Sequence, residues 1–204
     1  MIIVNNGLGN LASIQNILKQ IGLSSEISND YDKISKASKI ILPGVGNFKK
    51  GMEYLSENKL DLGILNAARN NSTILGICLG MHFLFDESEE GNVKGLGLIK
   101  GKVIKFQIKD EDLRVPHMGW NFVNFDKKSK LNFDLNEKIK FYFAHSYYVE
   151  CEEKDDIAAT TKYSLNFTSA VQKNNIFGVQ FHPEKSHKFG KSFFKNFFNN
   201  CNEY

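Results

Sequence analysis

The chain has 204 residues, of which 42% are hydrophobic and 24% are charged, and this composition excludes a disordered or fibrous protein. Its 26 basic residues exceed its 23 acidic residues by 3 and are scattered along the sequence, so neither nucleic acid nor a membrane surface is an expected partner. No apolar run approaches the roughly 18 residues of a membrane span, so we expect a cytoplasmic protein. We expect residues 1–204 to form one domain.

Short apolar runs alternate with helical patterns over the first 80 residues. Strands are predicted at 1–4, 39–42 and 72–77, with a short polar strand at 24–27, and helices at 10–21, from about 48, and at 60–70. Strands that alternate with helices predict a parallel sheet covered on both faces. Ligands of such sheets lie at the carboxyl ends of the strands.

The second half of the chain changes to short runs without long helical patterns between them. Strands are predicted at 101–108, 121–125, 140–143, 147–150, 157–163, 168–172 and 176–181, with a final helix at 188–200. Antiparallel pairing is expected among these strands, and five phenylalanines at helical spacing in the final helix predict core packing. The fold class predicted is α/β, with a mostly parallel central sheet, helices on both faces and a smaller antiparallel sheet.

The clearest chemical signal is a cysteine between two glycines, where a strand should turn into a helix. The motif Gly76-Ile77-Cys78-Leu79-Gly80 has the layout of a nucleophile elbow, whose tight turn leaves little room for neighbouring side chains. We expect Cys78 to lie exposed at a helix N-terminus, where free N–H groups and the helix dipole favour the attacking thiolate. The alternative is an ordinary buried thiol.

A second motif, at 178–184, ends a predicted strand with a histidine and then a carboxylate. A nucleophilic thiol needs a base that takes and returns its proton, and that base needs a third group to orient it. We therefore predict a catalytic triad of Cys78, His182 and Glu184. A parallel sheet can bring its strand ends together despite their separation in sequence. The alternative is a buried thiol and a surface His-Pro-Glu turn.

The loop Pro43-Gly44-Val45-Gly46 follows a predicted strand and is expected beside the elbow. A backbone N–H group of Val45 or Gly46, together with that of Leu79, would form an oxyanion hole for a tetrahedral intermediate. The alternative is a tight connection, which is the commonest meaning of such glycines.

A competing signal follows the first strand, where Gly7-Leu8-Gly9-Asn10-Leu11-Ala12 satisfies the G-x-G-x-x-G/A pattern of dinucleotide sites. Such a site needs an acidic residue at the end of a second strand, and Glu26 or Asp30 would have to serve. Because the strand at 24–27 is short and polar, we expect no dinucleotide and no other cofactor.

Other reactive residue types show no metal-binding pattern. The cysteines are Cys78, Cys151 and Cys201, an odd number with wide spacing that argues against disulfides and CxxC sites. The histidines outside the triad are His82, His117, His145 and His187. Their spacing predicts no metal site. The only tryptophan, Trp120, is either a buried aromatic near a turn or part of an interaction surface.

The elbow and the histidine motif together resemble the triad, or class I, glutamine amidotransferases. This α/β family of flavodoxin-like fold hydrolyses glutamine and passes ammonia to a synthase. Four segments narrow the resemblance to the glutaminase subunits of imidazole glycerol phosphate synthase. They are 43–46, 116–121, 141–148 and 181–186, and they extend across nearly the whole chain.

The resemblance implies a role for each matching residue. Cys78 would form a γ-glutamyl thioester, His182 would be the acid and base, and Glu184 would orient it. The residues implied for glutamine recognition are His82, Glu90, Tyr142, Ser146 and Tyr147. Those implied for the face that meets the synthase are Asn10, Trp120 and Lys185. The implied partner is a cyclase subunit in a heterodimer. Ammonia would cross between the subunits without entering bulk water, where it is mostly protonated.

The predicted function is hydrolysis of L-glutamine to glutamate and ammonia for a cyclase that makes imidazole glycerol phosphate and aminoimidazole carboxamide ribotide in histidine biosynthesis. Two positions depart from the family pattern: His82 stands where relatives usually carry glutamine, and Asn5-Asn6-Gly7 stands where they carry an aspartate before the turn. Residues 185–190 also resemble paralogues that supply ammonia to a sugar-amidating partner in surface-glycan synthesis. Two further alternatives are a catalytically silent interaction subunit and a cysteine hydrolase that acts on peptides.

Overall fold

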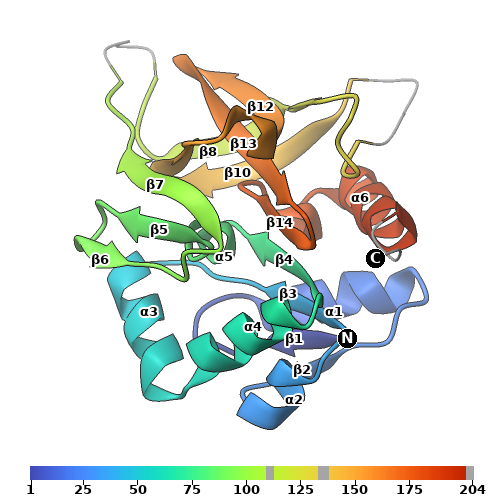
Figure 1. Cartoon of the computed structure of the whole chain (residues 1–204). Helices are drawn as coiled ribbons and strands as arrows, with labels where there is room; N and C mark the ends of the chain where they lie inside the picture. The colour runs from blue at the N-terminus through green and yellow to red at the C-terminus, as the bar shows by residue number, and fades with distance from the viewer. Residues whose placement is uncertain (109–112, 133–137, 201–204) are drawn as a thin grey trace.

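The computed structural model describes residues 1–108, 113–132 and 138–200. Its main feature is a sheet of twelve strands among these residues (Figure 1). The strand order is β2-β1-β3-β4-β14-β13-β11-β7-β5-β6, with β12 paired to β13 and β9 paired to β12. Two further strands, β8 and β10, form a separate antiparallel ribbon.

The elements have the following bounds. The strands are β1 Ile2–Val4, β2 Glu26–Ser28, β3 Lys39–Leu42, β4 Thr73–Ile77, β5 Phe85–Ser88, β6 Val93–Lys94, β7 Ile99–Lys105, β8 His117–Phe122, β9 Asn124–Phe125, β10 Lys140–His145, β11 Tyr147–Cys151, β12 Ile157–Tyr163, β13 Leu165–Lys173 and β14 Ile176–Val179. The helices are α1 Leu11–Gln20, α2 Tyr31–Ser35, α3 Phe48–Glu57, α4 Leu60–Arg69, α5 Leu79–His82 and α6 His187–Asn200, with short 3-10 turns at Lys154–Asp156 and Pro183–Lys185.

The half of the sheet formed by β2, β1, β3, β4 and β14 is parallel. Alternate strand residues point to opposite faces, and both faces are apolar. Ile3, Ile41 and Leu75 belong to the same buried cluster as the apolar residues of α1 and α6, whereas Ile40 and Ile74 join those of α2, α3 and α4. Helices therefore cover both faces of the parallel half (Figure 1), and the predicted fold class is confirmed.

The antiparallel strands β13, β11 and β7 continue the same sheet, and the separate antiparallel sheet is the β8–β10 ribbon. The sequence did not predict α2, β5 or β6. Helix α2 has five residues, and β5 carries the acidic pair Asp86 and Glu87, so neither presents a clear apolar period. Strand β5 is held by pairing with β7, and β6 by pairing with β5, rather than by an apolar pattern of their own.

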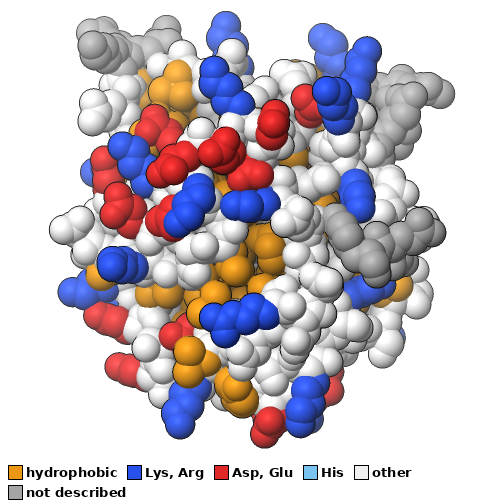
Figure 2. Space-filling view, viewed as in Figure 1, with side chains coloured by type: hydrophobic (Ala, Val, Ile, Leu, Met, Phe, Trp, Pro, Cys, Tyr) orange, Lys and Arg blue, Asp and Glu red, His pale blue; other side chains and the backbone are white. Residues whose placement is uncertain are grey.

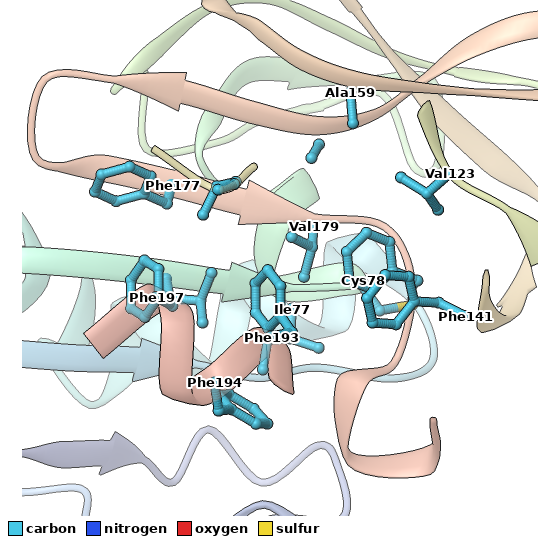
Figure 3. Close-up of a cluster of buried hydrophobic side chains, with 14 of the residues drawn as sticks. Ile77, Cys78, Val123, Phe141, Ala159, Phe177, Val179, Phe193, Phe194 and Phe197 are labelled. Atoms are coloured by element: carbon cyan, nitrogen blue, oxygen red, sulfur yellow. The ribbon is translucent and has the colours of Figure 1, made fainter. Parts of the chain in front are cut away.

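The phenylalanine stripe of α6 is core packing, as predicted. Its members Phe189, Phe193, Phe194, Phe197 and Phe198 are all at most 5% exposed. Figure 3 shows three of them beneath β4 and β14, with Phe197 below Phe177 and Phe193 beside Ile77, next to Cys78. The stripe therefore packs directly under the part of the sheet that carries the candidate nucleophile.

The outer surface shown in Figure 2 carries lysines and acidic residues side by side rather than a stripe of one sign. Several are paired, such as Lys100 with Asp86 at 2.8 Å and Lys102 with Glu150 at 3.8 Å. Among the described residues, no helix is long and apolar enough to cross a membrane.

Candidate active site

The nucleophile elbow forms directly after β4. Cys78 has φ 55° and ψ −111°, a conformation that a non-glycine residue rarely adopts, and its backbone N–H donates to the Val179 carbonyl at 2.8 Å. Gly80 is required at this turn, because a Cβ atom there would lie 1.7 Å from the Leu42 carbonyl oxygen. At Gly76 a Cβ atom would lie 2.6 Å from the Gly80 carbonyl oxygen. The two glycines let β3 and the elbow approach closely.

The structure corrects one part of the sequence analysis. Cys78 was expected to be exposed at a helix N-terminus, but it is only 5% exposed, and α5 has just four residues. The side chain lies among Ile77, Val179 and Phe141 on one side (Figure 3) and lines a cavity of about 200 Å³ on the other. A single helical turn provides little dipole, so the groups beside the sulfur must supply most of its stabilisation.

The candidate base, His182, and its candidate orienting group, Glu184, lie beside Cys78. β14 pairs with β4 in parallel and ends at Val179, so His182 is delivered next to the elbow. His182 Nδ1 and Glu184 Oε1 are 2.8 Å apart, and both side chains are at most 4% exposed. With Nδ1 engaged by the carboxylate, Nε2 remains for the hydrogen bond between His182 and Cys78. This is the relative arrangement of nucleophile, base and orienting acid in a catalytic triad.

The electrostatics of the site favour a protonated His182. Burial lowers the pKa of His182, but the charge of Cys78, the Cys78 hydrogen bond and the Glu184 carboxylate outweigh it and raise the pKa to about 10. His182 therefore holds a proton at neutral pH. An imidazolium next to the sulfur stabilises a thiolate and can later give its proton to a leaving amine.

A glutamine that the sequence analysis did not assign also touches the nucleophile. Gln180 is 0% exposed, and its Nε2 donates to Cys78 Sγ at 3.8 Å. Its Oε1 lies 2.7 Å from His82 Nε2. The signal that could have identified Gln180 is a polar residue directly after the apolar strand β14 and two positions before His182.

Most of the predicted recognition residues line the cavity above Cys78. The predicted residues among its lining are Val45, Gly46, Leu79, His82, Glu90, Ser146 and Tyr147. Cys78 also lines the cavity, together with four residues that had no predicted site role: Pro116, Met118, Ala144 and His145. Tyr142 lies outside this lining on β10, where its backbone carbonyl accepts from the His182 N–H at 2.8 Å.

Two lining residues, Glu90 and Tyr147, could make polar contacts with a ligand. Glu90 Oε2 accepts from the Phe48 N–H at 2.8 Å, at the first residue of α3. Burial, helped by the negative charges of Glu90 and Glu89, raises the pKa of Tyr147. A carboxylate and a phenol at the cavity rim are suited to a ligand with an ammonium group and hydrogen-bonding ends.

The backbone N–H group of Leu79, a candidate oxyanion donor, already has a hydrogen-bond partner in this structure. The Leu79 N–H donates to the Gly44 carbonyl at 3.3 Å. Val45 and Gly46 follow at the cavity wall, and Gly46 has φ 103°, in the region that favours glycine. In this conformation the Gly44 carbonyl oxygen occupies the Leu79 donor that an oxyanion would need.

Two histidines form a buried pair across the β8–β10 ribbon. His117 and His145 are paired in register, with His117 Nδ1 2.9 Å from His145 Nε2. His145 Nδ1 lies 2.7 Å from the Tyr147 carbonyl oxygen, which fixes that nitrogen as a donor and Nε2 as an acceptor. Burial lowers the pKa of His117 to about 4 and that of His145 well below its ordinary value. The pair is neutral and holds the segment carrying Ser146 and Tyr147.

The three residues implied for the partner face lie outside the cavity. Trp120 is 43% exposed, stacks on His187 with ring centroids 5.8 Å apart, and meets Tyr142 edge-on. Lys185 Nζ lies 5.8 Å from the Tyr142 ring centroid. Asn10 caps α1, where its side chain accepts from the Ser13 N–H.

The remaining cysteines and possible metal ligands were compared over the part of the chain that the structure describes. Within the described ranges, no group of three or more His, Cys, Asp or Glu side chains could hold a metal ion. Burial raises the pKa of the Cys151 thiol to about 12, which makes it a poor nucleophile. Cys201 lies outside the described residues.

Comparison with known proteins agrees with this geometry. The sequence profile of the family described as "Glutamine amidotransferase class-I" matches residues 2–201. The chain belongs to this family of glutamine-hydrolysing enzymes, as the elbow and the histidine motif predicted.

Relatives with similar sequences indicate which kind of class I glutamine amidotransferase this chain resembles. "Imidazole glycerol phosphate synthase subunit HisH 2" of Methanococcus maripaludis is 53% identical over 197 residues, covering 96% of each chain. The protein of the same name from Pseudomonas aeruginosa is 42% identical, covering 97% of this chain and 98% of its own. "Imidazole glycerol phosphate synthase subunit HisH" of Sulfurimonas denitrificans is 47% identical, covering 96% and 95%. The resemblance to glutaminase subunits of this synthase is confirmed.

Solved structures support the fold. A structure described as a glutamine amidotransferase aligns with a TM-score of 0.77 at 14% identity, covering 99% of both chains. PurLQS from Thermotoga maritima aligns with a TM-score of 0.73 at 20% identity, covering 97% of this chain and 96% of the other.

Proposed function

We propose that residues 1–204 form a single glutamine amidotransferase domain that acts as the glutaminase subunit of an imidazole glycerol phosphate synthase. It hydrolyses L-glutamine to glutamate and ammonia and channels the ammonia to a cyclase subunit in histidine biosynthesis. The observation that carries the proposal is the buried contact of His182 with both Cys78 and Glu184, where Cys78 also lines a cavity of about 200 Å³. The three HisH relatives match over nearly the full length of the chain.

The chemistry proceeds in two steps at the sulfur. The Cys78 thiolate attacks the side-chain amide carbon of glutamine, and the resulting tetrahedral intermediate expels the amine, which takes the proton from His182 and leaves as ammonia. The products are a γ-glutamyl thioester and a neutral imidazole. A water molecule then attacks the thioester while His182 takes its proton, which releases glutamate and restores the thiolate–imidazolium pair. Glu184 holds the imidazole in the required orientation through both steps.

The oxyanion hole requires a change in the 43–46 loop. The tetrahedral oxygen needs the Leu79 N–H, which now donates to the Gly44 carbonyl. Rotation of a peptide in Gly44-Val45-Gly46 would remove that carbonyl and supply a second N–H. We therefore expect the isolated chain to have low activity. We expect activation when a partner and its ligand rearrange this loop.

The partner surface is the exposed side of β8. Met118, Trp120 and Phe122 alternate along this strand, so they share one side, and they are 64%, 43% and 50% exposed. Lysines flank the two aromatic rings, with Lys140 Nζ 5.7 Å from the Trp120 ring and Lys138 Nζ 5.8 Å from the Phe122 ring. Met118 also lines the cavity, so an apolar partner seated here would cover the cavity mouth and keep ammonia out of bulk water.

Glutamate release tests the proposal directly. The purified chain is assayed alone, with the organism's imidazole glycerol phosphate synthase cyclase, and with that cyclase plus its ribotide ligand. We expect activation of at least about 100-fold, since one oxyanion donor is worth about 10²–10³ in kcat. The activation must disappear in Cys78→Ala. Equal activity with and without the cyclase would contradict the proposed partner.

Trp120→Ala is expected to weaken binding of the cyclase by about 30-fold, because a central aromatic residue typically contributes about 2 kcal/mol to an interface. Isothermal titration calorimetry gives the Kd. The matched control is Leu62→Ala, an apolar residue that is 51% exposed on α4. Equal Kd values for the two variants would place the interface elsewhere.

A second candidate partner is a sugar-amidating enzyme of surface-glycan synthesis. The observation that favours it is the resemblance of residues 185–190 to paralogues that supply ammonia to such a partner. Labelling of Cys78 by a glutamine-analogue electrophile, with no activation by the cyclase, would support this candidate. Absence of both labelling and activity would support a catalytically silent interaction subunit.

A further inference from the structure

Gln180 connects His82 to the candidate nucleophile through two contacts. His82 Nε2 lies 2.7 Å from Gln180 Oε1, and Gln180 Nε2 lies 3.8 Å from Cys78 Sγ. All three side chains are buried, with exposures of 4%, 0% and 5%. Water therefore has little access to these groups, and each must be satisfied by the others.

The chemistry of the three groups fixes which atom donates. The Gln180 carbonyl oxygen can only accept, so His82 must carry a proton on Nε2. Burial lowers the pKa of His82 to about 4, so the ring is neutral above that pH and holds this one proton on the donating side. The Gln180 amide nitrogen then faces the sulfur. The opposite amide orientation would place a carbonyl oxygen against a thiolate, and the two negative groups would repel each other.

We propose that His82 is a positioning residue that orients the Gln180 amide so that its N–H donates to the Cys78 thiolate. This role differs from the contact with glutamine that the family resemblance implies for the position. The inference rests on the proposal that Cys78 is the nucleophile. A hydrogen bond to a buried thiolate stabilises it, so the His82–Gln180 contact raises the fraction of enzyme ready to attack.

Alkylation of Cys78 in the absence of glutamine distinguishes a positioning role of His82 from a direct contact between His82 and glutamine. The full-length chain reacts with iodoacetamide across a pH series, and the Cys78 peptide is quantified by mass spectrometry. In His82→Phe the Gln180 carbonyl loses the N–H donor that orients the amide, and hydrogen bonds to charged groups are stronger than those to neutral groups. We expect the midpoint of the pH profile to rise by about one pH unit, so that the rate at any pH below the midpoint falls by about ten-fold.

Three further variants make the test specific. Gln180→Leu should show the same upward shift, and the double variant should shift no further, because the two residues act as one unit. His82→Gln keeps an N–H donor of similar reach and should restore the wild-type profile. Met81→Leu, a buried neighbour of similar size in α5, is the matched packing control and should leave the profile unchanged. Circular dichroism checks that each variant is folded, and Gln180→Leu alone tests the inference if His82→Phe does not fold.

Steady-state kinetics of the cyclase complex then tests whether His82 affects catalysis or glutamine binding. We expect His82→Phe to lower kcat with little change in KM for glutamine. An unchanged alkylation profile in both His82→Phe and Gln180→Leu would overturn the inference, as would a raised KM with an unchanged profile, which would make His82 a substrate contact. Failure of the proposed function is separate: it would appear as glutaminase activity that survives in Cys78→Ala.

Discussion

Cys78→Ser is expected to lower kcat for glutamine hydrolysis by at least about 10³-fold in the cyclase complex, because a serine hydroxyl at this site is a far weaker nucleophile than a thiolate. The substitution exchanges one atom of a buried side chain and leaves the strained backbone turn unchanged, so the fold should be retained. Glutamate release under saturating glutamine gives kcat, and a thermal melt confirms folding. Activity within ten-fold of the wild type would exclude Cys78 as the nucleophile.

The same variant should change the titration of His182. Burial alone would lower the pKa of His182, and it is the Cys78 charge and hydrogen bond, together with Glu184, that raise it to about 10. A neutral hydroxyl supplies no charge, so the pKa should fall towards the ordinary value near 6.5. In the wild type, the stability contributed by protonated His182 is present below the unfolded-state pKa and is lost as the pH rises through about 10. In Cys78→Ser this loss should occur at lower pH.

NMR of labelled histidine measures this shift, with His82 as an internal reference. Its pKa, lowered to about 4 by burial and hydrogen-bonded to Gln180, should remain low in both proteins. A His182 titration that stays near 10 in Cys78→Ser would mean that Glu184 alone keeps the imidazole charged.

Gly80→Ala is expected to destabilise the fold by at least about 3 kcal/mol, which lowers Tm by about 6–12 °C for a chain of this size. The added Cβ would lie 1.7 Å from the Leu42 carbonyl oxygen, and the obstacle is backbone rather than a flexible side chain. Leu42 is the last residue of β3 and pairs with Gly76 of β4, so any shift disturbs the sheet beneath the elbow. Activity should fall with stability because Cys78 moves as well.

Gly63→Ala is the matched control. Gly63 lies within α4, and a Cβ atom there would meet Ile34 Cγ2 at 3.3 Å, the end of a side chain that can adjust. Alanine also favours the helix by up to about 1 kcal/mol, so we expect Tm to be unchanged or slightly raised in a calorimetric scan. A similar loss of Tm in both variants would show that the close approach of Gly80 to Leu42 is not the cause of the destabilisation.

The parallel half of the sheet and the grouping of Cys78, His182 and Glu184 could be predicted from the sequence because each has a local signature. Apolar strands alternate with helical patterns, and the elbow and histidine motifs are contiguous. Contacts that depend on the register between two paired strands could not be predicted from the sequence. His117 and His145 meet only because β8 and β10 pair them directly across the ribbon, 28 positions apart. The burial of Cys78 was also missed, since the tertiary packing of Val179 and Phe141 decides it.

The position of β14 in the sheet has a consequence for the synthesis of the protein. This strand is formed by residues 176–179 of a 204-residue chain, yet it lies between β4 and β13 in the middle of the sheet. Until a ribosome has added these residues, β4 and β13 have unpaired edges, and the Cys78 thiol has no imidazole beside it. Insertion of this central strand joins the two parts of the sheet, and the residues that follow it supply His182 and then the buried phenylalanines of α6. A chain that stops before His182 therefore lacks both the proposed base and part of the core.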